Sequence, residues 1–293
     1  MESKSRYNLL VPESRRVLLS ITSSVLIFIG VMILALLTYN PVAASFSVSL
    51  GILLSVSGVI IYSHYTKDSR LVNIPNPWAA GVLIPLIQIT ACIAYYYNPM
   101  NHGPITIVIG MGVFPSYIFT NKTHFLRYLP LVAVLVGLGF TVYYSNVLWL
   151  NHSMLYAVIS SVFVAGLLML NRVNGTVNLV GIVVLGNFAV NTLFVLGLMA
   201  LGIYPLYDEL GLVCFCVFAG ALIGVGAILG AVSRAEDINC IGYSTIGMLQ
   251  ILVDGVVFGI NPIGQLFLPS LPIFIGIEGL LIVSLWKKNK ISE

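Results

Sequence analysis

The chain has 293 residues, of which 59% are apolar and only 8% charged, with a net charge of +3 and a mean hydropathy of +1.03. Soluble domains carry about 25% charged residues, so this chain has too few to cover a surface in water. The small net charge lacks the basic footprint of a nucleic-acid-binding protein, and the apolar content excludes intrinsic disorder. The composition therefore predicts an all-α integral membrane protein.

Ten apolar segments follow one another along the chain. Each is close to the roughly 20 residues that a helix needs to cross a bilayer. The first follows a basic stretch but is long for a signal peptide, so we interpret it as a retained helix. The short connections leave no room for a soluble domain. The predicted spans are residues 17–37, 42–63, 78–97, 103–120, 128–145, 152–170, 177–203, 208–233, 240–260 and 264–286.

The basic residues give this segmentation an orientation. All 13 lysines and arginines fall in the two tails or in every second loop, and the opposite loops contain none. Cytoplasmic loops carry an excess of Lys and Arg, so we predict a multi-pass inner-membrane protein with both termini in the cytoplasm. The cytoplasmic tails would be residues 1–16 and 287–293. Tyr95 to Tyr97, at the end of the third span, are expected in the interfacial aromatic belt.

Three short motifs of the first half recur in the same order in the second half, at offsets of 137, 137 and 139 residues. This offset equals five spans and predicts two repeats, residues 17–145 and 152–286. Because five is odd, the second repeat enters the membrane from the other side. Inverted repeats of this kind underlie alternating access in many secondary transporters. The matching motifs are Ser23-Ser24-Val25 and Ser160-Ser161-Val162, Ile109-Gly110-Met111 and Ile246-Gly247-Met248, and Leu129-Pro130 and Leu268-Pro269.

Residues at the ends of the repeats carry a family resemblance. The stretch from Pro104 to Val142 and the segment Val257-Phe258-Gly259-Ile260-Asn261-Pro262 resemble helices of the drug/metabolite transporter superfamily, in its EamA-like branch of ten-helix permeases. The resemblance covers Val17 to Trp286. It implies a carrier of small metabolites or drugs, often an exporter. Ile260 departs from the family, whose members often have a glutamate there.

Polar side chains inside the spans are the candidates for a solute pathway, because such groups normally face a bundle interior or a wet cavity. Three spans place an amide side chain near half depth, which suggests that the three converge. Asp254 shares a helical face with Gln250, which precedes it by one turn. The candidate pathway residues are Gln88, Tyr117, Asn187, Asn191, Gln250, Asp254 and Glu278.

Each candidate also has a structural interpretation. Asp254 would either contact a cationic solute or carry a coupling proton, or be a hydrogen-bonded structural carboxyl group. The amides could instead join helices, since such bonds contribute about 0.6 kcal/mol on average in one measured bundle. Glu278 lies nearer the cytoplasmic end and could extend to the interface.

The leading hypothesis is a secondary transporter that moves a small organic solute, with export as the expected direction. The sequence contains no pattern typical of a membrane enzyme, a zinc site or a phosphate-binding loop, so we expect no catalytic residue, metal or cofactor. The expected partners are the lipid bilayer and the solute, with a coupling proton as a candidate. Two alternatives are an ion-coupled carrier of the bile-acid or sodium–proton type and a non-transporting membrane component. Homodimer formation is left open.

Overall fold

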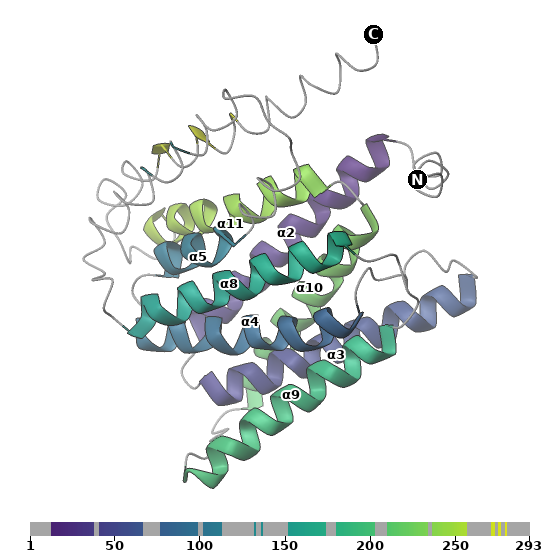
Figure 1. The fold of residues 1–293 in the computed structure, drawn as a ribbon, viewed down its shortest axis with the longest axis vertical. Coiled ribbons are helices and arrows are strands. Elements are labelled where there is room, and N and C mark those ends of the chain that lie inside the picture. The colour runs from purple at the N-terminus through teal and green to yellow at the C-terminus, as the bar shows by residue number, and fades with distance from the viewer. Residues whose placement is uncertain are drawn as a thin grey trace.

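The computed structural model describes residues 13–37, 41–66, 77–98, 102–112, 152–173, 180–202, 210–233 and 236–256, and single positions at 132, 136, 271, 272, 275, 276 and 279. Within these residues every regular element is a helix (Figure 1). In chain order the helices are α2 (Glu13–Leu37), α3 (Pro41–Thr66), α4 (Pro77–Tyr97), α5 (His102–Gly110), α8 (His152–Val173), α9 (Val180–Ala200), α10 (Leu210–Ser233) and α11 (Glu236–Val256).

The eight helices coincide with eight of the predicted spans, so the all-helical prediction is confirmed for the described part of the chain. The span predicted at 103–120 differs, because α5 ends at Gly110. Met111 and Gly112 then form a turn in which the Gly112 N–H donates to the Ile109 carbonyl at 3.2 Å. Pro115 follows, and a proline ring in a continuing helix would clash with the carbonyl four residues earlier. The predicted spans 128–145 and 264–286 lie outside the described residues, apart from isolated helical positions.

By length and composition, two of the described helices are apolar enough to cross a bilayer. These are α2, over Val17–Leu34, and α10, over Val213–Gly230. Four others contain shorter apolar stretches, at Ser47–Tyr62, Gly81–Tyr97, His152–Leu167 and Ala189–Ala200.

The packing of the helices repeats between the first half of the chain, α2 to α5, and the second half, α8 to α11. The pair α2–α10 corresponds to α8–α4, the pair α3–α10 to α9–α4, and the pair α2–α11 to α8–α5. The pairs α3–α9 and α5–α11 correspond to themselves. Only the contacts of α4 with α2 and α3 lack a counterpart of similar extent among the described helices. Exchanging the halves thus reproduces most of the packing.

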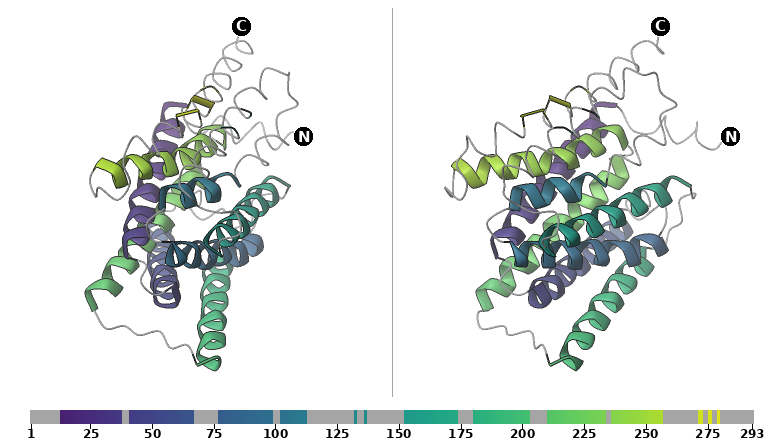
Figure 2. Two further views of the ribbon diagram at one scale, coloured as in Figure 1. Left: turned by 90° about the vertical axis from the view of Figure 1, so that its left-hand side faces the viewer. Right: turned by 60° about the vertical axis from the view of Figure 1, so that its left-hand side comes forward.

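The pictures show the same order. In Figure 1, α5 and α11 lie side by side at one end and α3 and α9 at the other, with α2, α10, α4 and α8 between them. In the left view of Figure 2, α2 and α8 lie on opposite sides of the molecule. Each half therefore contributes one helix to every level of the arrangement.

Direct backbone contacts fix the relative directions of the helices. Residues of α2 contact α10 in reverse order, since Gly30 approaches Ala219 while Gly226 approaches Ser23. These two helices are therefore antiparallel. Residues of α3 instead contact α10 in the same order, because Gly220 approaches Val48 and Gly224 approaches Ile52. The helices α3 and α10 are therefore parallel.

Glycines let α10 lie between α2 and α3. A Cβ added at Gly226 would lie 2.9 Å from the Ser23 carbonyl oxygen, and one added at Gly220 would overlap the Val48 carbonyl. Small residues at helix interfaces let backbones approach closely in membrane bundles. The small-residue face of α10 is therefore a packing surface.

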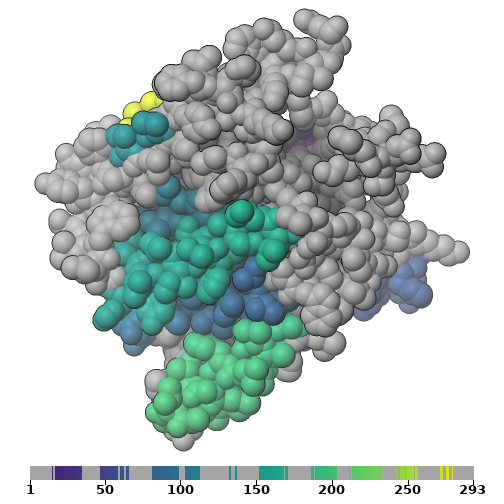
Figure 3. All heavy atoms as spheres, viewed as in Figure 1, coloured from purple at the N-terminus to yellow at the C-terminus, as the bar shows by residue number. Residues whose placement is uncertain are grey.

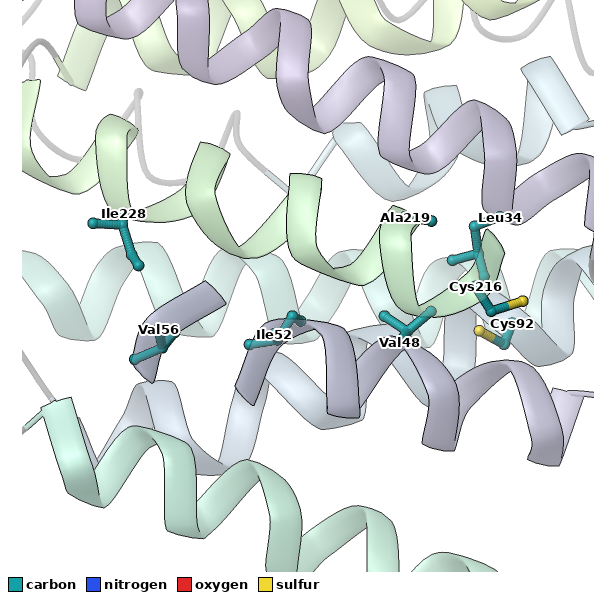
Figure 4. Close-up of a cluster of buried hydrophobic side chains, with 8 residues drawn as sticks. All are labelled: Leu34, Val48, Ile52, Val56, Cys92, Cys216, Ala219 and Ile228. Atoms are coloured by element: carbon teal, nitrogen blue, oxygen red, sulfur yellow. The ribbon is translucent and has the colours of Figure 1, made fainter. Parts of the chain in front are cut away.

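The apolar interior is centred on α3 and α10 (Figure 4). The cluster contains Val48, Ile52 and Val56 of α3, Cys216, Ala219 and Ile228 of α10, and Leu34 of α2. Cys92 of α4 completes the cluster beside Cys216, so all these helices meet there. Both cysteines are free thiols, whereas Cys214, two residues before Cys216 on α10, is exposed.

Several small polar residues are buried in the bundle beside its apolar core, and many large apolar residues are exposed. In α8, Ser153 and Ser160 are buried while Leu155 and Val162 are 54% and 63% exposed. The outer surfaces of α8, α4 and α9 lie next to one another on the face in Figure 3. A helix of a soluble protein instead presents a mostly polar face to water.

We predict that Gly51→Ala destabilises the protein by about 1–3 kcal/mol, as overpacking typically does. A Cβ at Gly51 would overlap the Val217 carbonyl of α10. Gly58→Ala in the same helix is the matched control, because nothing lies within 4 Å of its Cβ position. The measurement is thermal unfolding of purified protein in detergent. Equal effects of the two substitutions would contradict the close contact of α3 with α10.

Candidate functional site

Two serines of the repeated motif make matching hydrogen bonds. The Ser23 hydroxyl of α2 donates to the Gly226 carbonyl of α10 at 2.6 Å. The Ser160 hydroxyl of α8 donates to the Ile87 carbonyl of α4 at 3.1 Å. Both serines are fully buried, and each joins the first helix of one half to the third helix of the other. These duplicated bonds belong to the architecture that the two halves share.

A first polar cluster joins α3 to α9. The Ser49 hydroxyl donates to Oδ1 of Asn187 at 2.9 Å. Nδ2 of Asn191 donates to the same oxygen at 3.0 Å and to the Asn187 backbone carbonyl at 2.9 Å. Asn187 is 2% exposed, yet its own Nδ2 has no hydrogen-bond partner among the described residues. Two amide protons are therefore held in place without a described acceptor.

A second cluster joins α4, α5 and α11. The Thr106 hydroxyl donates to Oε1 of Gln250 at 2.5 Å, and the Tyr95 hydroxyl lies 2.6 Å from the Thr106 oxygen. A hydroxyl has a single proton, so Tyr95 is the donor to Thr106. Gln250 is fully buried, and its Nε2 has no partner among the described residues. The chain of hydroxyls thus fixes the amide, whose N–H groups have no acceptor within the described part of the chain.

Gln88 lies on the same face of α4 as Tyr95, about two helical turns earlier. It is 7% exposed, and neither its Oε1 nor its Nε2 has a partner within the described part of the chain. A buried polar group without a partner costs about 1–3 kcal/mol, so groups of this kind call for an explanation.

Both clusters lie where the two halves meet. Exchanging the two halves corresponds to a half-turn about an axis between them. A helix that packs against its own counterpart lies next to this axis, because the half-turn moves a distant helix to the opposite side of the molecule. The pairs α3–α9 and α5–α11 are of this kind. The bonds of Asn187 and Gln250 bridge these two pairs. Between them, α4 carries Gln88 and packs against α9 and α5.

The amides have no counterparts in the other half. At the offset of 137 residues, the position equivalent to Asn187 is Leu50, that of Gln250 is Val113, and that of Gln88 is Val225. The two serine bonds are duplicated, but the amides are not. Packing of the shared architecture therefore does not require them, which favours a functional role.

Four predicted pathway residues lie in the described helices: Asn187 and Asn191 belong to the first cluster and Gln250 to the second, whereas Gln88 has no described hydrogen bond to either. Asp254 belongs to α11, one turn beyond Gln250, and its side chain lies outside the described residues. Tyr117 and Glu278 also lie outside them. Within the described residues, no group of three or more His, Cys, Asp or Glu side chains could hold a metal ion.

The sequence missed three members of the network, namely Ser49, Tyr95 and Thr106. The prediction that Tyr95 to Tyr97 all sit in the interfacial belt was wrong for Tyr95, which is 2% exposed, whereas Tyr96 and Tyr97 are 47% and 49% exposed. The position of Tyr95, seven residues after Gln88, was the available signal, since it places both on one helical face.

No family model matches the chain, and no curated protein does. Seven chains of solved structures are similar to it. One of these, titled "Crystal structure of protein", superposes on 93% of this chain and 99% of its own length, with a TM-score of 0.60 and 15% sequence identity. This likeness shows a shared fold alone.

We predict that Thr106→Val destabilises the protein by about 1–3 kcal/mol, because the valine leaves the Gln250 oxygen buried without its donor. Adding Gln250→Leu should recover part of this loss, since both partners are then apolar. A double-mutant cycle by thermal unfolding measures the coupling. Strictly additive losses would contradict the bond between the two side chains.

Proposed function

We propose that the protein is a secondary transporter that moves a small organic solute across a membrane by alternating access, with the buried amides lining its path. The observation that carries this proposal is the placement of unpaired, unduplicated amides at the axis between two halves that otherwise repeat each other's packing. Transporters built from inverted repeats hold their substrates at the repeat interface, near the bilayer midplane.

The exposed apolar faces of the helices support a membrane setting. The exposed faces of α2 carry Leu18, Ile21 and Val25, while Ser20 and Ser23 are buried. In water this arrangement would expose a large apolar surface, whereas in a bilayer the same surface faces lipid. Serines inside then serve as close-packing donors between helices.

Helix directions support an additional span between α5 and α8. The helices α4 and α5 are joined by a connection of a few residues, and Tyr95 of α4 reaches Thr106 of α5, as in an antiparallel hairpin. The helices α4 and α8 are also antiparallel, because Tyr97 contacts Tyr156 while Ile87 contacts Ser160. Therefore α5 and α8 run the same way, and we propose that residues 128–145 return the chain across the membrane as a fifth span. Exposed helical positions at Val132 and Val136 agree with this assignment.

These helix directions and the fifth span support the full proposal of ten spans in two inverted repeats, with both termini in the cytoplasm. In an inverted repeat the relating axis lies in the membrane plane, so a site on the axis is equally far from both surfaces. Exchange of conformation between the two halves would then open this site to one side and close it to the other. The resemblance to EamA-like permeases points to the same class.

Within this scheme, a buried amide on the path, such as Asn187, would replace part of the water around a polar solute with fixed hydrogen bonds. The Asn187 side chain is already oriented by Ser49 and Asn191, so little reorganisation is needed when solute arrives. We assign proton coupling to Asp254, because a carboxyl group in the bilayer interior exchanges protons more readily than any amide.

We predict that a cysteine at position 100 labels with an impermeant maleimide in intact cells, whereas one at position 67 labels only after permeabilisation. Both are introduced into a cysteine-free chain as Met100→Cys and Lys67→Cys. The two positions lie in loops on opposite sides of the third span. Labelling of position 67 in intact cells would contradict the proposed orientation.

We predict that Asn187→Leu lowers solute flux by about tenfold or more, the effect of losing one hydrogen bond to a transported solute. The matched control is Ser160→Ala, which also removes a buried interhelical bond but one that is duplicated, and which should keep most of the flux. The measurement is counterflow of labelled amino acids, amines, sugars and nucleosides in liposomes containing purified protein. Equal losses in both variants would indicate a purely structural role for Asn187.

We predict that Asp254→Asn abolishes accumulation driven by a pH gradient while leaving expression intact. The amide cannot release or take up the coupling proton, so only downhill exchange should remain. Uptake is compared with and without the gradient in the same liposomes. Gradient-driven accumulation by the variant would remove Asp254 from the coupling role.

A further inference from the structure

Six of the described helices form two packing groups, and each group contains helices from both halves of the chain. In the first, which we call the α10 group, α10 packs against α2 and α3. In the second, the α4 group, α4 packs against α8 and α9. Each of these four contacts is more extensive than any contact between a helix of one group and a helix of the other.

Close backbone contacts hold each group together. In the α10 group, a Cβ added at Gly220 would overlap the Val48 carbonyl. In the α4 group, a Cβ added at Gly186 would lie 3.0 Å from the backbone of Gly81. None of the glycine contacts described between these six helices joins one group to the other. Helices whose backbones interlock in this way cannot slide past one another without first separating, so each group is a rigid unit.

The boundary between the two groups is made by side chains. Cys92 of α4 lies beside Cys216 of α10 in the apolar cluster (Figure 4). The Ser49 hydroxyl of α3 donates to Oδ1 of Asn187 in α9 at 2.9 Å. One side-chain hydrogen bond contributes little net stability, and the α3–α9 and α3–α4 contacts are less extensive than those inside a group. The boundary is therefore held less firmly than either group.

The pair α5–α11 connects the two groups at one end of the molecule. The helix α11 packs against α2, where Gly242 contacts Ser24, and α5 packs against α8. The pair is itself interlocked, since a Cβ added at Gly247 would lie 2.7 Å from the backbone nitrogen of Ile107. The α3–α9 crossing lies at the other end (Figure 1). The two groups are thus joined firmly at one end and loosely at the other, which is the arrangement of a hinge.

We infer that the moving units of the protein are the α10 group and the α4 group rather than the two halves of the sequence, and that they rotate against each other about the α5–α11 pair. This inference rests on the transporter function proposed above. Rotation of rigid units about an interface is a recurring form of conformational switching. Asn187 lies on the boundary that opens, so the hydrogen bond from Ser49 is a latch that holds the described conformation.

The test measures three distances in full-length protein in lipid nanodiscs, by pulsed electron paramagnetic resonance between spin labels on introduced cysteines. All labelled positions are exposed in a chain whose native cysteines are replaced. Leu18→Cys with Phe215→Cys joins α2 to α10, and Val82→Cys with Leu196→Cys joins α4 to α9. Both pairs lie in one group but in different halves. Leu196→Cys with Phe215→Cys joins α9 to α10, in one half but in different groups.

We expect two populations of distances for the pair Leu196–Phe215 and a single narrow distance for each of the other two pairs. Movement of the sequence halves predicts the reverse, with a fixed distance for Leu196–Phe215 and two populations for the others. That reverse pattern, one fixed distance for all three pairs, or two populations for all three would overturn the inference. If the chain without its native cysteines does not fold, a ketone-bearing amino acid carries the labels at the same positions.

Ser49→Ala in the labelled chain tests the latch. Loss of the bond to Asn187 should shift the two Leu196–Phe215 populations away from the described conformation by about twofold to tenfold, the effect of one hydrogen bond on an equilibrium. Ser160→Ala is the matched control, because its bond to the Ile87 carbonyl lies inside the α4 group, so the ratio should not change. Equal shifts in both variants, or no shift in Ser49→Ala, would overturn the latch.

Counterflow of labelled solutes in liposomes separates this inference from the proposed function. Two populations across the boundary without flux of any solute would leave the moving units standing and remove the transporter. Flux together with the reverse pattern of distances would leave the transporter standing and overturn the moving units.

Discussion

Each half of the chain inserts its third helix between the first two helices of the other half. The helix α10 packs against α2 and α3, and α4 packs against α8 and α9. At the first of these contacts the backbones meet at Gly51 and Gly220, where no side chain larger than hydrogen fits. Neither half can close its own core without the other, so the two form one unit. The apolar cluster around Cys92 and Cys216 lies where the inserted helices meet.

This interlocked packing determines where polar groups can be tolerated. The serine bonds of Ser23 and Ser160 occur in both halves and use backbone carbonyls, so they stabilise the fold wherever it is repeated. The amide network instead occupies the two self-paired crossings and has apolar counterparts. A protein selected for stability alone would fill both sides with aliphatic residues, since unpaired buried amides reduce stability. Their retention on one side is the physical basis of the functional proposal.

The all-helical class of the described residues could be predicted from the sequence, because the length of each apolar segment indicates where a helix forms. The boundaries of α2 and α8 followed from hydropathy, and the Ser23 and Ser160 motifs revealed the repeat. The site was predicted less completely. Buried amides are conspicuous in an apolar helix, but the hydroxyls that orient them are common residues. Thr106 and Tyr95 became meaningful only when the hairpin of α4 and α5 brought them to Gln250. Hydropathy also could not show that α5 ends at Gly110.

The account depends on position 187 being reachable from both sides of the membrane in turn. The most direct measurement is labelling of a single cysteine, introduced as Asn187→Cys into a cysteine-free chain in sealed vesicles of either orientation, by an impermeant thiol reagent. The account predicts labelling from each side, while Ala219→Cys, fully buried in the apolar interior, stays unlabelled. Protection of position 187 from both sides would contradict the account, because a side chain that no aqueous reagent reaches cannot line a solute path.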